Sequence, residues 1–170
     1  FTLKEIFIRD WNASTIKKAN KMDYVDEYFQ LPTYDSKRNI SMQIVADGPE
    51  NFEEILHGGF IKMILAAEKR VWLQSPYLIP DDTMINALLI AVRSGIDVRI
   101  MIPSMPDHPF IYRATQYYAN YLTKRGVKVY LYQEGFIHAK TVIMDDTIAS
   151  FGTTNQDIRS YSLNFEVSAF

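Results

Sequence analysis

The sequence predicts an α/β protein with a mixed, largely parallel sheet that is covered by helices on both faces. From residue 40 onward, short strand-like runs alternate with amphipathic segments of roughly 10 to 18 residues, a pattern typical of crossover connections between parallel strands. Near residue 138 the pattern changes to two apolar runs separated by the turn "DD", which indicates an antiparallel hairpin at one side of the sheet.

Composition narrows the class of protein. The 170 residues are 48% hydrophobic and 22% charged, which suits one hydrophobic core. A formal net charge of -2 shows no basic excess, so no nucleic-acid partner is predicted. The absence of cysteine excludes disulfides and thiolate metal sites. No apolar run approaches the roughly 18 to 20 residues of a membrane span, so the chain itself is expected to be soluble.

Both ends of the chain look cut. It opens at Phe1 without an initiating methionine and closes on the strand-like run "LNFEVSAF". We therefore expect an excised piece of a longer protein, truncated at the C-terminus.

Residues 1–39 are expected to form a helix and a polar connecting segment. Leu3, Phe7 and Trp11 recur on one helical face. Residues 12–39 are rich in Lys, Asp, Tyr and turn residues, and they predict an irregular connection that serves as a linker or as a binding loop.

Residues 40–170 are expected to form one domain that begins with three strand–helix units. The predicted pairs are 40–47 with 51–69, 70–80 with 81–95, and 97–104 with 108–126. The apolar stripe of the first helix runs through Phe52, Ile55, Phe60, Ile64 and Leu65. Further strands are predicted at 127–133, 138–145, 147–152 and 163–170.

The second helix carries recognisable end signals. Asp81 or Asp82 can cap its start and Gly95 can end it. We favour a capping role for the two aspartates over an acid–base pair.

His138 and Lys140 are the first candidates for chemistry. Residues two apart in a strand share a face, so both nitrogens project together from what reads as a buried apolar strand. Burying ionisable groups costs several kcal/mol unless they are paired or used. A histidine nucleophile beside a fixed positive charge suits a phosphoryl group.

The predicted hairpin returns the chain to the level of His138. The turn contains Asp145, and the second strand ends at Gly152, whose backbone freedom permits a special turn. Thr153 and Asn155 follow it. The hydroxyl and the amide can donate to phosphate oxygens, so the group resembles an anion cradle. Asp145 has two interpretations, either part of the chemistry or a turn former that bonds the backbone.

The spacing H-x-K-x4-D-x6-G-[ST]-x-N resembles the signature of the phospholipase D superfamily. The positions that fall on it are His138, Lys140, Asp145, Gly152, Thr153 and Asn155. Threonine stands where many members have serine, which keeps the hydroxyl. Glu166 follows Asn155 by eleven residues, where the family commonly has an acidic residue that holds the catalytic histidine. The stretches "QSPYLIPDD", "SGIDVRIMIPSMPDHPF", "GTTNQDIRSYSLNFEV" and the opening "FIRDWNAST" resemble the carboxy-terminal half of bacterial cardiolipin synthases and the segment before it.

The resemblance implies a phospholipase D-like domain that is one half of a two-half fold. It implies a phosphatidyltransferase that moves a phosphatidyl group between two phosphatidylglycerol molecules through a phosphohistidine, releases glycerol and needs no metal or other cofactor. The implied catalytic residues are His138, Lys140 and Asp145. Thr153, Asn155 and Glu166 would bind phosphate or support the site.

This chain holds only one copy of the signature. His57 and His108 are followed two residues later by Gly59 and Phe110 rather than by lysine. The second histidine would therefore come from a missing amino-terminal half or from a second copy of the chain. The parent protein is expected at the cell membrane, and the chain alone is expected to be inactive or weakly active.

Alternative interpretations stay open. The same site could serve a phospholipase D, or a single-motif nuclease acting as a homodimer, and the chain could be a non-catalytic α/β interaction module. His108 lies after a strand's carboxyl end, where it is either a substrate contact or an exposed polar group. Phe110, Tyr117 and Tyr121 are either core packing or the lining of an acyl-chain path.

Overall fold

The computed structural model describes residues 2–23 and 40–170, and its contacts divide the chain into units 1–44 and 45–170. The first unit contains α1 (Thr2–Ser14) and the 3₁₀ helix η1 (Lys18–Asn20), which confirms the predicted amino-terminal helix. Asn12 holds the segment after the helix, since its side chain donates to the Met22 carbonyl at 2.8 Å and accepts from its N–H at 2.7 Å. The rest of the predicted connection, 24–39, lies outside the described residues.

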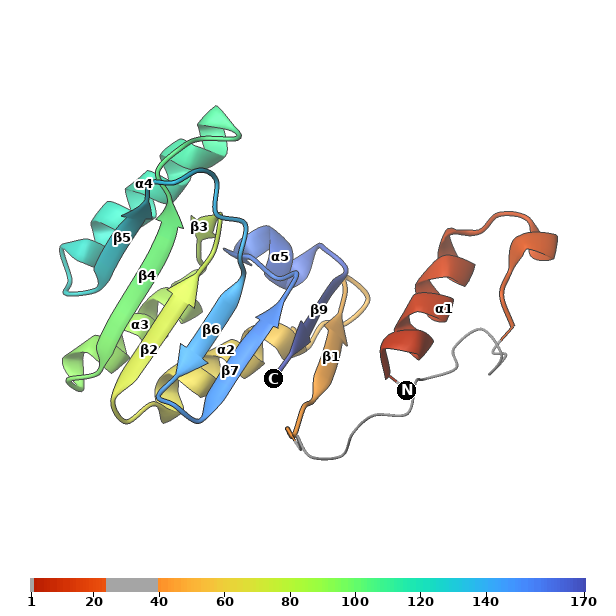
Figure 1. The fold of residues 1–170 in the computed structure, drawn as a ribbon, viewed down its shortest axis with the longest axis horizontal. Helices are drawn as coiled ribbons and strands as arrows, with labels where there is room; N and C mark the ends of the chain where they lie inside the picture. Colours follow the sequence, from red (N-terminus) through yellow and green to blue (C-terminus); the bar gives the residue numbers. More distant parts are fainter. Residues whose placement is uncertain (1, 24–39) are drawn as a thin grey trace. The chain divides into compact units, whose positions relative to one another are not determined.

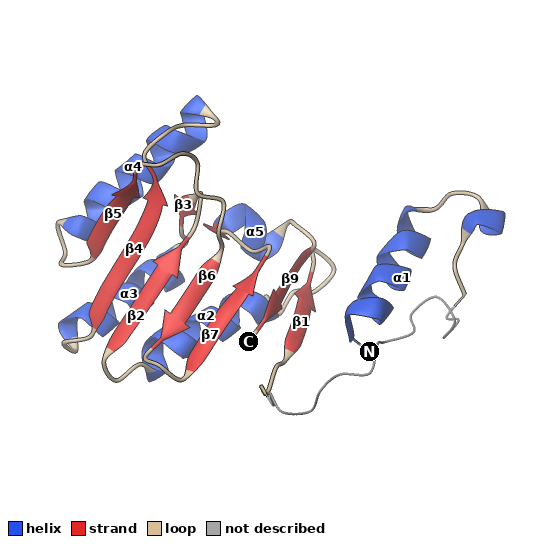
Figure 2. Ribbon diagram, in the orientation of Figure 1, coloured by secondary structure: helices blue, strands red, loops and turns tan. Residues whose placement is uncertain are grey.

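The second unit contains a large sheet, a small sheet and four helices (Figures 1 and 2). The large sheet has the strand order β1-β9-β7-β6-β2-β4-β5. Its strands are β1 (Ile44–Asp47), β2 (Arg70–Gln74), β4 (Asp97–Pro103), β5 (Lys128–Tyr132), β6 (Thr141–Met144), β7 (Ile148–Gly152) and β9 (Glu166–Ala169). In the small sheet β3 (Leu78–Ile79) runs parallel to β8 (Gln156–Asp157). The helices are α2 (Ile55–Ala66), α3 (Asp82–Arg93), α4 (Pro109–Thr123) and α5 (Ile158–Ser162).

The mixed α/β class and the hairpin are confirmed, but the sheet is less parallel than expected. β2 pairs with β4 and β4 with β5 in parallel, whereas the β2–β6, β6–β7 and β7–β9 pairs are antiparallel. The sequence placed the hairpin at one side of the sheet. It lies instead in the middle, because β6 joins directly to β2.

The described helices pack on one face of the sheet, which differs from the predicted cover of both faces. Val71 and Leu73 of β2 are buried with the apolar sides of α2 and α3, which lie behind the strands in Figure 1. Trp72 between them points the other way and lines a surface pocket of about 300 Å³ with Arg99 and Ile143. Buried and partly exposed residues alternate along β2 and along most of β4, as expected for a sheet with one buried face.

A side-chain cap fixes the start of α3. Asp81 accepts from the Met84 N–H at 2.9 Å and caps α3, as predicted. The expected apolar stripe of α2 is correct at Phe60 and Ile64, which are buried, but wrong at Phe52, which precedes the helix and is 95% exposed, and at the exposed Ile55 and Leu65. The Asp47 carboxylate accepts from the Leu56 N–H at 2.9 Å, and this contact from outside the helix sets where the helix begins.

Candidate active site

His138 and Lys140 lie just before β6, in a segment without regular strand pairing. His138 is exposed and Lys140 is half-buried, so the predicted buried strand is wrong at this point. The reason is the length of the neighbouring strand. β2 ends at Gln74, which pairs with Thr141, and the residues before Thr141 extend past the edge of that pairing.

The two side chains nevertheless meet. Nζ of Lys140 lies 3.1 Å from each ring nitrogen of His138 and donates to the His138 carbonyl at 2.9 Å. Partial burial lowers the pKa of the Lys140 ammonium, while the carboxylates of Glu166 and Asp157 oppose that shift. A cation and an accessible imidazole are therefore held together.

β7 brings Gly152 beside this pair. The Gly152 N–H donates to the Lys140 carbonyl at 3.3 Å. A Cβ at Gly152 would lie 2.2 Å from the Val167 carbonyl oxygen and 2.4 Å from Oγ of Ser168. The glycines with positive φ are elsewhere in the described chain, so Gly152 serves the close approach of β9 rather than the special turn we predicted.

Thr153 and Glu166 form the next contact. The Thr153 hydroxyl donates to Oε2 of Glu166 and accepts from the Val167 N–H at 2.9 Å. The other oxygen of Glu166 accepts from Nδ2 of Asn164 at 3.1 Å. The buried Glu166 thus binds Thr153 rather than His138, and its effect on the pair is electrostatic, through Lys140.

Asn155 lies in the loop between β7 and β8. Its Nδ2 donates to Oγ of Ser160 at 3.2 Å, while its Oδ1 is buried without a hydrogen-bond partner. Asp157 caps α5 by accepting from the Ser160 N–H at 2.7 Å. We did not predict β8, α5 or these contacts, although an aspartate three residues before Ser160 is a helix-start signal in the sequence.

The structure does not bring Asp145 to His138. Asp145 lies at the far end of β6 with φ of 51°, and its carboxylate accepts from the N–H groups of Lys69 and Arg70 at 2.9 Å and of Glu68 at 3.1 Å. These backbone bonds, with that of Arg70 foremost, lower the pKa of the Asp145 carboxyl. The geometry favours the turn-forming interpretation of this residue.

His108 is exposed immediately before α4, with its ring 6.5 Å from that of Phe110. Neither a hydrogen bond nor a ring contact joins it to His138 in the described part of the chain. Its neighbour Asp107 instead accepts from the Tyr77 hydroxyl, and this bond raises the pKa of Tyr77 to about 12. A substrate contact for His108 stays a prediction.

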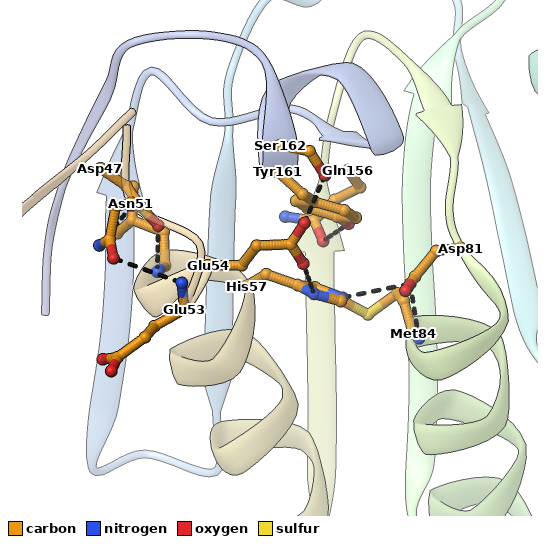
Figure 3. Close-up of polar contacts among 11 residues, drawn as sticks. Asp47, Asn51, Glu53, Glu54, His57, Asp81, Met84, Gln156, Tyr161 and Ser162 are labelled. Atoms are coloured by element: carbon orange, nitrogen blue, oxygen red, sulfur yellow. Dashed lines mark hydrogen bonds and ion pairs between the residues drawn. The ribbon is translucent and has the colours of Figure 1, made fainter. Parts of the chain in front are cut away.

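His57 lies in a buried cluster (Figure 3). From the sequence it was considered only to exclude a second signature, because Gly59 rather than lysine follows it two residues later. Its Nδ1 lies 3.3 Å from Glu54, and its Nε2 forms an ion-pair contact at 3.1 Å with Asp81 that falls outside hydrogen-bond geometry. The imidazole stacks on Tyr161 at 4.3 Å, and the Tyr161 hydroxyl donates to Gln156 at 3.0 Å. The cluster ties α2 and α3 to α5.

Residues 2–23 and 40–170 lack two structural features. They contain no group of three or more His, Asp or Glu side chains placed to hold a metal ion. None of their helices has the length and apolar character needed to cross a membrane.

The fold and the paired His138 and Lys140 define a phospholipase D-like domain. Its backbone is similar to Nuc from Salmonella typhimurium, a phospholipase D family member, with a TM-score of 0.63, 22% identity and coverage of 76% of this chain and 80% of that one. It is also similar to phosphatidylserine synthase from Haemophilus influenzae, with a TM-score of 0.66, 17% identity and coverage of 82% and 36%. At these identities the likeness shows the fold.

Sequence comparison then identifies the family. Residues 60–170 match the family described as "Cardiolipin synthase, PLD-like domain", and the chain belongs to it. Over 170 residues the chain is 51% identical to a cardiolipin synthase of Listeria welshimeri, and over 164 residues it is 50% identical to the major cardiolipin synthase ClsA of Bacillus subtilis. It covers 34% and 33% of those proteins, so it spans about a third of the length of its curated relatives.

Proposed function

We propose that the full-length protein containing this chain transfers a phosphatidyl group from one phosphatidylglycerol to another, forming cardiolipin and releasing glycerol. The observation that carries the proposal is the accessible His138–Lys140 pair in a chain whose whole length aligns with a cardiolipin synthase. The activity for which that relative is named, cardiolipin synthesis, supplies the substrate class. We also propose that the full-length protein works at the membrane surface, where phosphatidylglycerol resides.

The proposed reaction has two displacements at phosphorus. A ring nitrogen of His138 attacks the phosphorus of the first lipid, the bond from phosphorus to the glycerol oxygen breaks, and that oxygen takes a proton from a general acid. The hydroxyl of the second lipid then attacks, its proton returns to the same group, and the bond between nitrogen and phosphorus breaks. Covalent catalysis of this kind divides one difficult displacement into two easier ones.

The chain's own residues would stabilise the charge that develops on phosphorus. The ammonium of Lys140 lies beside the attacking ring and can bind the non-bridging oxygens. Asn155 is assigned to the same oxygens, since it lies in the loop after Gly152 and its Nδ2 has a second hydrogen to donate beside the one given to Ser160. Glu166 and Thr153 are assigned a supporting role, because they bind each other and Glu166 acts on Lys140.

The general acid is assigned to a second signature histidine outside this chain. It would come from the remaining two thirds of the full-length protein or from a second copy. Asp145 is assigned to the hairpin turn, because its carboxylate is occupied by three backbone N–H groups.

The test compares the full-length protein with its His138→Ala and Lys140→Met variants on phosphatidylglycerol in detergent micelles. Cardiolipin and free glycerol should appear in equal amounts, and both should fall at least about a thousandfold in His138→Ala. Lys62→Met, on the exposed side of α2, is the matched control for the lysine and should retain activity. Undiminished cardiolipin formation by His138→Ala would sink the proposal, and phosphatidic acid in place of cardiolipin would indicate a phospholipase D.

A further inference from the structure

A pocket of about 450 Å³ opens beside the candidate active site. It lies among the small sheet, the start of α4 and α5, within unit 45–170. Its volume falls in the range of about 300 to 1,000 Å³ that small-molecule sites occupy. This pocket was not predicted from the sequence.

One side of the pocket is polar and continuous with the site. Asn155, Asp157 and Asn164 line this side. Asn164 donates to Glu166, and the carboxylates of Glu166 and Asp157 both act on the Lys140 ammonium. Glu166 also accepts from Thr153, which follows Gly152, and the Gly152 N–H donates to the Lys140 carbonyl, so hydrogen bonds connect this part of the pocket to Lys140.

The apolar lining residues of the pocket come from separate elements. They are Ile79 from β3, Ile111 from α4, Ile158 from α5 and Leu163 just after α5. Ile158 is 46% exposed and Leu163 is 65% exposed, so the described chain leaves both partly uncovered. Apolar side chains that converge on a pocket next to polar groups are typical of a ligand site for an amphipathic molecule.

We propose that this pocket binds an acyl chain of the phosphatidyl group while its phosphate lies at Lys140. The assignment rests on the proposed function, because it takes a diacyl phospholipid as the substrate. The exposed guanidinium of Arg159, which also lines the pocket, adds positive charge near the anionic headgroup.

This placement replaces the acyl path that the sequence suggested along α4. Tyr117 and Tyr121 line a different pocket, together with Asn120, Lys124 and Arg125. The Arg125 guanidinium covers the Tyr121 ring at 3.5 Å. A basic, polar lining of this kind does not suit an acyl chain, whereas the apolar lining around Ile158 does.

The pocket assignment predicts a chain-length preference. A methylene that moves from water onto an apolar wall gains about 0.8 kcal/mol, which is about fourfold in kcat/KM. Dioctanoyl phosphatidylglycerol should therefore exceed the dihexanoyl lipid by at least about tenfold in the full-length wild type. Ile158→Asn and Leu163→Asn should each reduce this preference at least about threefold.

Ile90→Asn is the matched control. Ile90 lies on α3 and does not line the pocket, and its exposed fraction of 50% is similar to the 46% of Ile158. This variant should keep the wild-type preference. A preference that is the same in the wild type, Ile158→Asn and Leu163→Asn would overturn the pocket assignment while leaving His138-dependent catalysis intact.

Binding without turnover separates the two proposals. In a His138→Ala background, titration calorimetry with dioctanoyl phosphatidylglycerol should show binding that Leu163→Asn weakens at least about threefold. Binding insensitive to Leu163→Asn refutes the pocket. If phosphatidylglycerol is neither bound nor turned over by any variant, the proposed function fails, and the pocket assignment fails with it.

Discussion

Gly152→Ala should destabilise the domain by displacing β9. The added Cβ would lie 2.2 Å from the Val167 carbonyl oxygen, where ordinary contact needs at least 3.4 Å, so the strand must retreat by about 1.2 Å. The obstacle is main chain, and it cannot rotate away as a side chain would. The same carbonyl accepts from the Thr153 N–H at 2.9 Å, so the retreat also weakens a bond inside the candidate site.

Overpacking of this kind costs about 1–3 kcal/mol, and the upper end applies because backbone must move. For a chain of this length, about 3 kcal/mol lowers the midpoint of thermal unfolding by about 6–12 °C. The assay is thermal unfolding of the 170-residue chain followed by circular dichroism.

Gly58→Ala is the matched control, because a Cβ at Gly58 in α2 meets nothing within 4 Å. Alanine in a helix interior is favoured over glycine by about 0.5–1 kcal/mol, so this variant should melt slightly above wild type. A Gly152→Ala chain that melts within about 2 °C of wild type would refute the close-approach reasoning.

Three further predictions concern single side chains. Asp81→Ala should cost about 1 kcal/mol in urea denaturation through loss of the α3 cap, whereas Asp82→Ala, inside the helix, should cost less. The pKa of Asp145 lies below its ordinary 3.8 in the folded chain, so its contribution to stability is present above pH 3.8 and is lost as the pH falls through the lowered pKa. Asp145→Asn should therefore weaken the dependence of the free energy of unfolding on pH in this acid range. An unchanged dependence would contradict the role of the backbone contacts of Asp145. The pKa of Lys140 lies below 10.5, so activity of the full-length protein should fall at a lower pH than an ordinary lysine would cause. Lys140→Arg, which keeps its charge, should move that alkaline limit upward in a pH–rate profile, and an unmoved limit would count against the role of Lys140.

Features that depend on neighbours in sequence were predictable. The cap at Asp81 needs only the helix that follows it, and the β6–β7 hairpin needs only its two apolar runs and the turn. His138 and Lys140 were also brought together as expected, because two residues two apart in extended chain share a side.

Features set by distant contacts were not predictable. Helix α2 begins after Phe52 because Asp47, nine residues before Leu56, binds that residue's N–H. His57 is buried between carboxylates and against Tyr161, which is more than a hundred residues away and gives no periodic signal. The exposure of His138 likewise depends on where the neighbouring β2 ends.

The spacing of the signature can be understood as the register of one hairpin. Thr141 pairs with Phe151 and Met144 with Ile148, and the same register continued by one step places Lys140 opposite Gly152. The fixed interval between lysine and glycine is therefore the length of the two strands and their turn, and Asp145 holds that turn to the start of β2.

An extra residue within that interval would turn every following side chain to the other face and carry Thr153 away from Glu166. The signature residues consequently divide by what they touch. His138 and Lys140 remain accessible for chemistry, while Asp145 and Gly152 fix the turn and the close strand contact that hold the pair in place. A motif recognised by its chemistry is constrained in its spacing mainly by sheet geometry.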